Sequence, residues 1–328
     1  MLYLSQAPPL NHTTAMAQQP PHTSSPLPYI ALIVCNLLWA TDYPLYHILL
    51  PHYLPPIVLL AAALLATTLF ALIPAIGGKV ERVERKDIPT LIGAALLLGV
   101  LHKGSLMMGL SRTSPVDGSI INAVGPLVVL ILSVIKGIDR LTPARVVGLI
   151  IGLSGAIAVI LMGDHSSRAT ATTEGDLLIV CAVVSTAMYT VFLKRLLGKY
   201  NVATVLLWVY AIATIVVLPF GVAKAVTTDF GVWDHRGMIS FVVVLCFLTY
   251  LPNALYNYSL RHIEPFRTSI FSYLQPVAAI ALSAIMRLDT INLPTVLLAL
   301  VVFVGIGIVL WSYRQPHRRN NEGKSADS

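Results

Sequence analysis

Charged residues are scarce in this chain of 328 residues. Asp, Glu, Lys and Arg together make up 11% of the sequence, whereas hydrophobic residues make up 56%. A soluble domain has about a quarter of its residues charged, and its core does not need this much apolar surface. The composition therefore excludes an ordinary soluble protein and predicts that most residues face lipid or other apolar residues.

Several motifs are also missing. The three cysteines, Cys35, Cys181 and Cys246, lie far apart inside apolar runs and form no CxxC pair, so neither a zinc site nor a disulfide framework is indicated. There is no GxxxxGK[ST] phosphate-binding loop, which argues against the use of ATP. The net charge of +7 is spread over the segments between apolar runs. We therefore expect no cofactor, no metal and no nucleic-acid partner.

The two ends of the chain are polar. Residues 1–27 are rich in Pro, Ser, Thr and His but contain no Lys or Arg, so they lack the basic start of a signal peptide. We expect a disordered cytoplasmic tail at 1–27, with Met16 as an alternative first residue, and a basic cytoplasmic tail at 314–328.

Ten apolar runs of about 20 residues lie between these tails, each long enough to cross a bilayer as a helix. None of them alternates polar and apolar residues as a barrel strand would, and backbone groups in lipid must be satisfied within the segment. The sequence therefore predicts an all-α polytopic membrane protein with ten transmembrane helices. They are expected at 28–48, 55–75, 89–110, 115–135, 144–162, 176–195, 203–223, 237–257, 266–286 and 293–313.

The basic residues predict an orientation for these helices. With the N-terminus in the cytoplasm, sixteen of the 22 Lys and Arg residues fall on the inner side and five on the outer side, and Lys103 lies within a helix. Cytoplasmic loops carry an excess of Lys and Arg. We therefore place both termini in the cytoplasm of a cell with the protein in its inner (plasma) membrane.

An internal repeat divides the chain. Residues 109–161 align with 259–311 at an offset of 150 without a gap. Identical pairs include Pro115 and Pro265, Ser119 and Ser269, Pro126 and Pro276, Leu132-Ser133 and Leu282-Ser283, and Gly155 and Gly305. Because each half, 28–162 and 176–313, holds five helices, the second half enters the membrane upside down. Inverted repeats of this kind are typical of secondary transporters.

Two charged residues lie deep within the expected helices at similar depth, Asp42 and Lys103. Each costs about 2.5–3.5 kcal/mol at mid-bilayer, so each should face protein or water. One interpretation is a structural ion pair between the first and third helices. Another is a pair that faces a cavity and binds a zwitterion or a proton. In a third, Lys103 reaches outward alone. The adjacent His102 is either a packing residue or part of a proton relay.

Further polar and aromatic residues are candidates for lining a cavity. Prolines at matched positions, Pro126 and Pro276, free backbone carbonyls and are expected either to mark the substrate path or to kink the helices for packing. The other candidates either line a cavity or hold helices together. They are Asn36, Trp39, Tyr43, Asn122, Tyr189, Asn253, Tyr256 and Gln275.

Several stretches together resemble the EamA family of the drug/metabolite transporter superfamily. They are Asn36 to Tyr43, Gly109 to Ile120 with Gly125-Pro126, Gly175 to Leu178, Ala187 to Thr190, and Ser272 to Pro276 with Asp289 and Gly305. The resemblance covers about residues 28–313. No single motif carries it; it lies in the order, the spacing and the duplication of these motifs. It implies ten helices in two inverted halves and the export of amino acids or other small metabolites. Asp42 and His102-Lys103 are more charged than that pattern, which indicates an unusual, charged substrate.

These observations predict a secondary transporter, an exporter of a small polar metabolite or amino acid that works by alternating access. Its partners would be that small molecule and the lipid bilayer, with a proton as a candidate coupling ion. The alternatives are a polytopic membrane enzyme and a receptor or regulatory subunit without flux. Deep in the helices the sequence offers only one carboxylate and one His-Lys pair, which is little for an enzyme.

Overall fold

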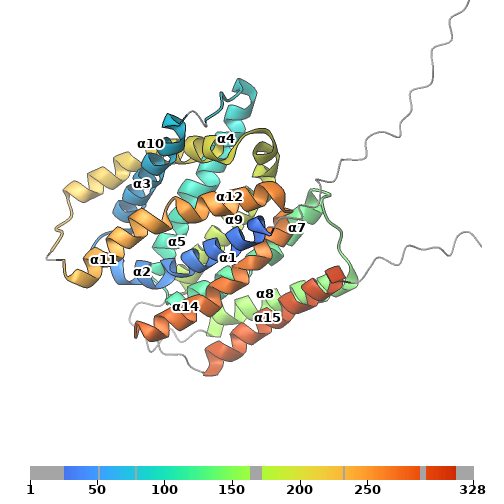
Figure 1. Ribbon diagram of the computed structural model, residues 1–328. Coiled ribbons are helices and arrows are strands. Elements are labelled where there is room, and N and C mark those ends of the chain that lie inside the picture. Colours follow the sequence, from blue (N-terminus) through green and yellow to red (C-terminus); the bar gives the residue numbers. More distant parts are fainter. Residues whose placement is uncertain are drawn as a thin grey trace, which may run out of the picture.

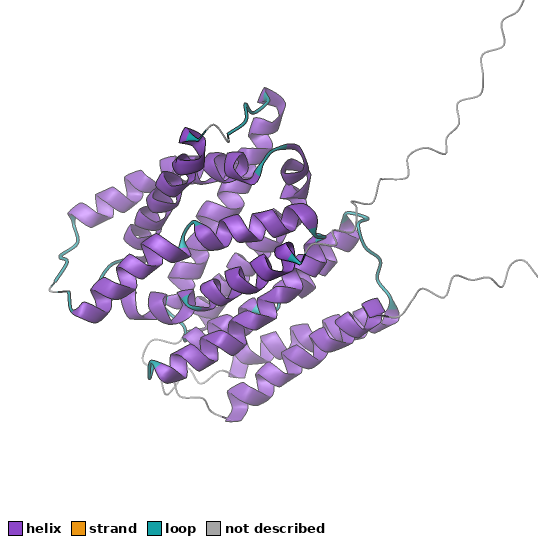
Figure 2. Cartoon of the chain, in the orientation of Figure 1, coloured by secondary structure: helices purple, strands orange, loops and turns teal. Residues whose placement is uncertain are grey.

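Helices account for every regular element in the part of the chain that the structure describes (Figure 2). The computed structural model describes residues 26–50, 52–77, 80–162, 172–231, 233–288 and 293–314. The tails expected at 1–27 and 314–328 lie outside these ranges, apart from residues 26, 27 and 314. The all-helical fold predicted from the sequence is confirmed for the described residues.

The first apolar run forms two helices rather than one. α1 spans Leu27–Ala40, α2 spans Asp42–Leu49, and Thr41 separates them. Pro44 has no N–H with which to bond the carbonyl of Ala40, so the regular ladder is interrupted here. Asp42 is consequently the first residue of a new helix rather than the middle of a long one.

Two further spans contain π-helical segments. The Arg85–Leu110 span consists of η1 (Arg85–Asp87), α4 (Ile88–Ala94), the π-helical η2 (Ala95–His102) and α5 (Lys103–Leu110). The His235–His262 span consists of α11 (His235–Val243), the π-helical η3 (Val244–Leu248) and α12 (Leu251–His262). Pro252 cannot bond the carbonyl of Leu248, which accounts for the break before α12.

The spans that carry the matched prolines are also interrupted. α6 (Pro115–Asn122) ends and α7 (Gly125–Ile135) begins just before Pro126. α13 (Pro265–Ser269) passes through the 3-10 segment η4 (Ile270–Tyr273) into α14 (Leu274–Ile285), which contains Pro276. Each proline removes the N–H that would have bonded the carbonyl four residues earlier.

The two spans end alike, each with a left-handed residue just after the helix. Gly137 has φ of 69° and Arg287 has φ of 55°. The amide of Ile138 donates to the carbonyl of Ser133 over 2.8 Å, and that of Leu288 donates to the carbonyl of Ser283 over 2.9 Å. These are helix-terminating bonds of the Schellman type, in which a left-handed residue satisfies the last carbonyls.

The remaining helices are continuous. They are α3 (Pro56–Ile76), α8 (Pro143–Met162), α9 (Thr173–Lys199), α10 (Val202–Val226) and α15 (Leu293–Arg314). Of these, α3 and α10 contain the internal prolines Pro74 and Pro219. Within the described ranges, seven helices or helical spans are long and apolar enough to cross a membrane, and the shorter apolar helices Pro143–Gly155 and Val296–Ser312 add to them. The chain is therefore built to be buried in a bilayer, and α1 with α2 is a broken apolar run.

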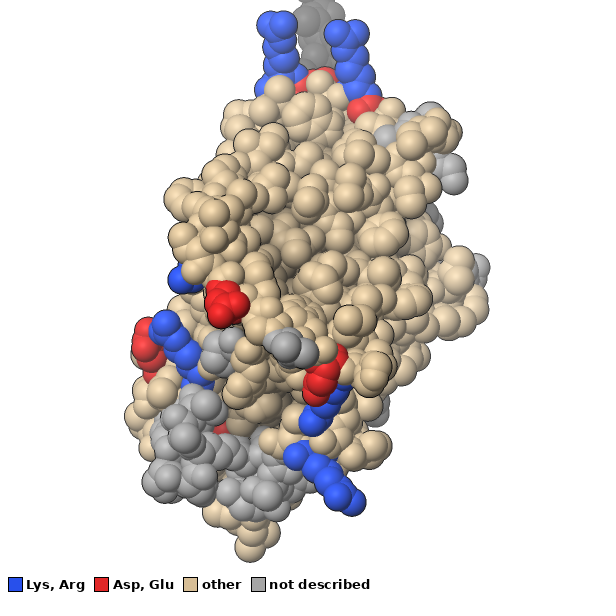
Figure 3. Space-filling model, turned by 90° about the vertical axis from the view of Figure 1, so that its left-hand side faces the viewer, with Lys and Arg blue, Asp and Glu red and all other residues tan. Residues whose placement is uncertain are grey.

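The helices pack in pairs around a central group. α3 lies along α10, α8 along α15, and α1 against α12 and α14 (Figure 1). The start of α1 and the end of α15 both lie toward the right-hand side of this view. On the face drawn in Figure 3, charged side chains gather near the top and in the lower half, and a broad band between them carries none. Such a band is suited to contact with lipid.

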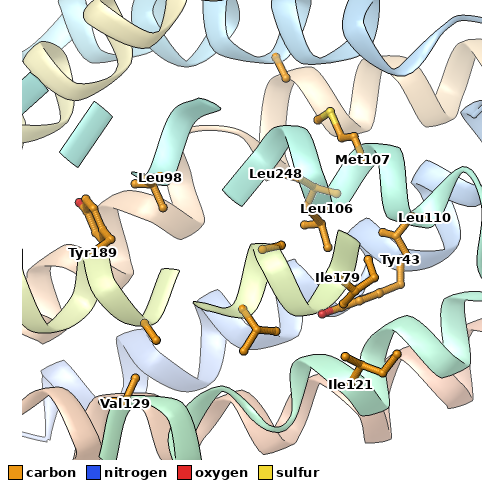
Figure 4. Packing of buried hydrophobic residues seen from close by; sticks show 14 of the residues in the cluster. Tyr43, Leu98, Leu106, Met107, Leu110, Ile121, Val129, Ile179, Tyr189 and Leu248 are labelled. Carbon is orange, nitrogen blue, oxygen red and sulfur yellow. The ribbon is translucent and has the colours of Figure 1, made fainter. Parts of the chain in front are cut away.

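The central packing joins the apolar faces of several elements. Tyr43 on α2, Leu110 on α5 and Ile179 on α9 gather in one cluster (Figure 4). Small residues permit this approach, since a Cβ at Gly109 would lie 2.6 Å from the Cδ1 atom of Ile179. Helices in lipid associate mainly through such close contact.

Glycines also bring α8 and α15 into backbone contact. A Cβ built on Gly305 would lie 2.2 Å from the amide nitrogen of Gly152 and 2.7 Å from the carbonyl oxygen of Gly148. Backbone atoms cannot swing aside as the end of a long side chain can, so the two helices would have to separate to admit a methyl group. On the same helix, a Cβ on Gly307 meets nothing within 4 Å.

We predict that Gly305→Ala destabilises the protein by about 1–3 kcal/mol, the usual cost of overpacking. Gly307→Ala is the matched control, and it should leave stability unchanged or raise it slightly because alanine favours helix. Thermal unfolding of the purified variants in detergent measures both. Equal melting temperatures for the two variants would contradict the close contact between α8 and α15.

Candidate functional site

A pocket lies among α1, α2, η2, α5, α6, α7, α9, α12, α13, η4 and α14. The space between the side chains that line it, including its opening to solvent, is about 860 Å³. Of the thirteen residues predicted as site candidates, all but Pro276 line this pocket. They are Asn36, Trp39, Asp42, Tyr43, His102, Lys103, Asn122, Pro126, Tyr189, Asn253, Tyr256 and Gln275. Pro276 is buried next to Gln275 but is not part of the lining.

The two deep charges face this pocket from different elements. Asp42 begins α2 and Lys103 begins α5, and each side chain is 3% exposed. They attract each other electrostatically, yet no ion pair with an N–O distance of 4.0 Å or less joins these two described residues. The Asp42 Oδ1 atom is buried and has no hydrogen-bond partner among the described residues. A direct ion pair is therefore absent from this conformation.

Two phenols lie within electrostatic reach of the Asp42 carboxylate. Tyr46 is one turn further along α2, and Tyr210 comes from α10. Both hydroxyl oxygens are buried. The Tyr46 hydroxyl approaches the Asp42 carboxylate as a donor without reaching full hydrogen-bond geometry, and the Tyr210 hydroxyl has no hydrogen-bond partner among the described residues. Buried polar groups normally find a partner, which can be an ordered water or a ligand.

His102 is held by a neighbouring helix. Its Nδ1 atom lies 3.0 Å from the carbonyl oxygen of Ala182 on α9, while the residue also lines the pocket. It therefore ties α9 to the end of the π-helical segment. This contact occupies one of the two ring nitrogens.

Gln275 is the centre of an amide network that joins three parts of the chain. Its Nε2 atom donates to the Asn36 Oδ1 atom over 2.7 Å. Its Oε1 atom accepts from the Asn122 Nδ2 atom at 2.9 Å and from the Tyr43 hydroxyl at 3.2 Å. The network thus links α1 and α2 to α6 and α14 beside the two proline breaks. Amides in an apolar protein need partners of this kind.

Aromatic and amide side chains from α9 and α12 form another part of the lining. The Tyr189 hydroxyl donates to the Asn257 Oδ1 atom over 2.7 Å. The Tyr256 hydroxyl lies 2.8 Å from Thr190 Oγ1, and its ring centroid lies 5.2 Å from that of Trp39. Asn253 donates to the Thr249 carbonyl over 2.5 Å, so part of its amide serves the backbone.

Some lining residues are not among the sequence candidates. They include the hydroxyl residues Thr186, Thr190, Thr268, Ser269 and Ser272. The spacing of Thr268, Ser272 and Gln275 places their side chains on one face of a helix. This spacing is the one feature of the sequence that could have identified the two hydroxyl residues as lining residues. Hydroxyls in membrane helices commonly bond the carbonyl four residues earlier, as Thr190 and Thr268 do, so their presence alone predicts little.

The lining offers a carboxylate, an ammonium group, several amides and an aromatic surface. Such a set suits a small molecule that carries both charges or polar groups next to an apolar part. Within the described ranges, no group of three or more His, Cys, Asp or Glu residues is placed to hold a metal ion.

The fold and the sequence are both similar to known proteins. A solved crystal structure has a TM-score of 0.63 at 17% identity, covering 88% of this chain and 99% of that one, which shows the shared fold. An uncharacterized transporter of Archaeoglobus fulgidus is 29% identical over 247 residues, which is 75% of this chain and 85% of the relative. The uncharacterized transporter YyaM of Bacillus subtilis is 27% identical over 213 residues, 62% of this chain and 68% of the relative.

A family model matches the chain in two stretches, residues 26–161 and 173–311. Together they cover most of the sequence and include every residue that lines the pocket. The resemblance noted from the sequence is confirmed: the chain is a multi-pass membrane protein that belongs to the EamA-like transporter family.

Proposed function

We propose that this protein is a secondary transporter that exports a small zwitterionic metabolite, such as an amino acid, across the inner membrane by alternating access. The observation that carries the proposal is that Asp42 and Lys103 face one pocket without forming an ion pair. A substrate with an ammonium and a carboxylate group would supply each of them with a partner. Membership in a transporter family supports flux rather than catalysis.

The proposed topology has ten crossings, both termini in the cytoplasm, and two inverted halves at 28–162 and 176–313. It is supported by the basic residues of the sequence and by α1 beginning and α15 ending toward the same side in Figure 1. Features at the 150-residue offset also support it. Helix interruptions accompany Pro126 and Pro276, and left-handed residues follow at Gly137 and Arg287.

The proposed mechanism uses the cost of burying charge. Without substrate, two isolated charges in an apolar protein are stabilised mainly by water in the pocket. A bound zwitterion replaces that water with direct partners, the Lys103 ammonium for its carboxylate and the Asp42 carboxylate for its ammonium. A proton on Asp42 would compete with the substrate's ammonium group, which provides a route to proton coupling. The Gln275 network would then rearrange as the halves rock, because it links elements on both sides of the pocket.

A metabolite screen tests the function. A strain that overproduces the protein would be scored for resistance to single amino acids and for their content in the medium, against a strain that overproduces Asp42→Asn. Proteoliposomes then separate the alternatives, since a transporter exchanges labelled substrate, an enzyme changes its identity, and a receptor does neither.

We predict that Asp42→Asn and Lys103→Gln each lower exchange of the substrate by about 30-fold or more, because a desolvated charge loses its partner. Yield and elution profile in detergent should stay near wild type. Asp229→Asn and Lys224→Gln are matched controls at exposed positions and should transport normally. Variants of Asp42 and Lys103 that unfold instead of losing transport would show that the two charges serve stability.

We also predict that Gln275→Met, which keeps the length of the side chain, lowers the exchange rate by about threefold to tenfold. The reason is that the polar atoms of Asn36, Asn122 and Tyr43 lose their shared partner. Exchange measured over a range of substrate concentrations separates affinity from rate. Wild-type values for both parameters would exclude the network from the transport cycle.

A further inference from the structure

Two tyrosine–aspartate hydrogen bonds occupy equivalent positions in the two halves of the chain. The Tyr53 hydroxyl donates to the Asp234 Oδ1 atom over 2.6 Å. The Tyr200 hydroxyl donates to the Asp87 Oδ2 atom over 2.7 Å. Tyr200 is 147 positions after Tyr53, and Asp234 is 147 positions after Asp87. We call Tyr53–Asp234 the first latch and Tyr200–Asp87 the second latch.

The latches lie at opposite ends of the α3–α10 pair. Tyr53 precedes α3 and Asp234 follows α10, whereas Tyr200 precedes α10 and Asp87 follows α3. Near the middle of the pair, the hydroxyls of Thr68 and Thr214 lie 2.8 Å apart. Each latch therefore joins one half of the chain to the other at an end of a shared, closely packed pair of helices.

Close packing makes this pair a firm support. A Cβ on Gly221 of α10 would lie 2.2 Å from the Cβ atom of Ala61 on α3. Helices in such contact cannot slide without separating, because their surfaces interlock. The latches are thus attached to a closely packed pair of helices that has little room to move.

Each aspartate directly precedes a helix. Asp234 caps α11 by accepting from the Gly237 amide over 2.7 Å, and Asp87 is the residue before α4. The hydrogen bond to Asp234 raises the pKa of the Tyr53 phenol, as expected for a donor to a carboxylate. Each latch consequently fixes the start of one span, α11 in the first case and α4 in the second.

Further contacts support both latches. The rings of Tyr53 and Trp233 lie 5.2 Å apart at the first latch. At the second latch, the Lys199 ammonium lies 2.5 Å from Asp87 and 2.7 Å from Glu84. The hydrogen bonds that Glu84 accepts from Lys199 and from Lys86 lower the pKa of its carboxyl group. The starts of α4 and α11 are therefore held by more than one interaction.

The π-helical segments lie just beyond these fixed starts and are also equivalent. Shifting η2 (95–102) by 147 positions gives 242–249, which contains η3 (244–248). Beyond η2, α5 brings Lys103 and Leu106 to the pocket, and beyond η3, α12 brings Asn253 and Tyr256 to it. A π-helical turn is rare, interrupts the regular hydrogen-bond ladder, and is a common cause of bends at functional sites.

We propose that the two halves share an anchor-and-hinge device. The latches hold α4 and α11 to the α3–α10 pair, while α5 and α12 bend at η2 and η3 and carry their pocket residues between two positions. The device deepens the proposed alternating-access function and rests on it. The experiments below measure protection from hydrogen exchange and distances between spin labels. Their outcome therefore does not depend on which substrate the protein transports.

Hydrogen exchange of the purified full-length protein in lipid nanodiscs tests the anchors. Tyr53→Phe removes one hydroxyl and should raise exchange at residues 235–240 by about threefold to tenfold, with residues 88–92 unchanged. Tyr200→Phe should do the reverse. Tyr29→Phe, at a position 40% exposed and outside both latches, should change neither segment. Protection that persists in both latch variants, or is lost equally at both segments, would overturn the anchors.

Distances between spin labels test the hinges. Labels at Ile239 and Arg261 flank η3, and labels at Thr173 and Arg195 lie on the uninterrupted helix α9, each pair 22 positions apart. A straight helix places both pairs about 33 Å apart. We expect a broad or two-peaked distribution across η3 and a narrow one in α9, in protein whose three native cysteines are replaced by alanine. Equally narrow distributions would overturn the hinge.

Discussion

Asp42 and Lys103 set the strongest constraint on this structure. Opposite charges that are buried in an apolar protein without contacting each other need another polar partner, such as water or a ligand. Each is 3% exposed, and both face the same pocket. A direct ion pair would satisfy both groups at once and would leave little reason for a pocket between them. Held apart, they place an acidic and a basic group at one pocket, and in the proposed function they determine which molecules gain by entering it. The surrounding amides and aromatic rings then fix shape rather than charge.

Irregular backbone is concentrated around this pocket. The break at Thr41, the interruptions at Pro126 and Pro276, and the π-helical segment η2 all lie at or next to lining residues, and η3 precedes α12, which carries three more. Non-helical backbone is tolerated at membrane depth only where protein or water satisfies its polar groups. By contrast α8 and α15, which lie on the periphery, are uninterrupted. The breaks in the helices thus mark the position of the pocket.

The sequence predicts the helices well because the need to satisfy the backbone in lipid leaves few choices. It also identifies Asn122 and Gln275, since proline breaks require polar groups nearby. It does not predict which way a residue faces on its helix: Pro276, expected either to mark the substrate path or to kink its helix for packing, is buried beside Gln275 and is not part of the lining. The equal depth of Asp42 and Lys103 in their predicted helices suggested that they could form an ion pair. Depth does not determine how each helix is rotated about its axis, nor does it reveal the break at Thr41. The π-helical segments leave no residue signature, because they depend on tertiary packing.

The glycine contact between α8 and α15 has a consequence for how the chain is made. Gly152 and Gly305 are 153 positions apart, yet their backbones touch. At about 5–20 residues per second, a ribosome needs about 8–30 s to make the intervening chain. During that time α8 is in the membrane without its partner, and its small-residue face is covered by lipid or by the insertion machinery. The contact between α8 and α15 therefore forms only after the last helix of the described chain has been made.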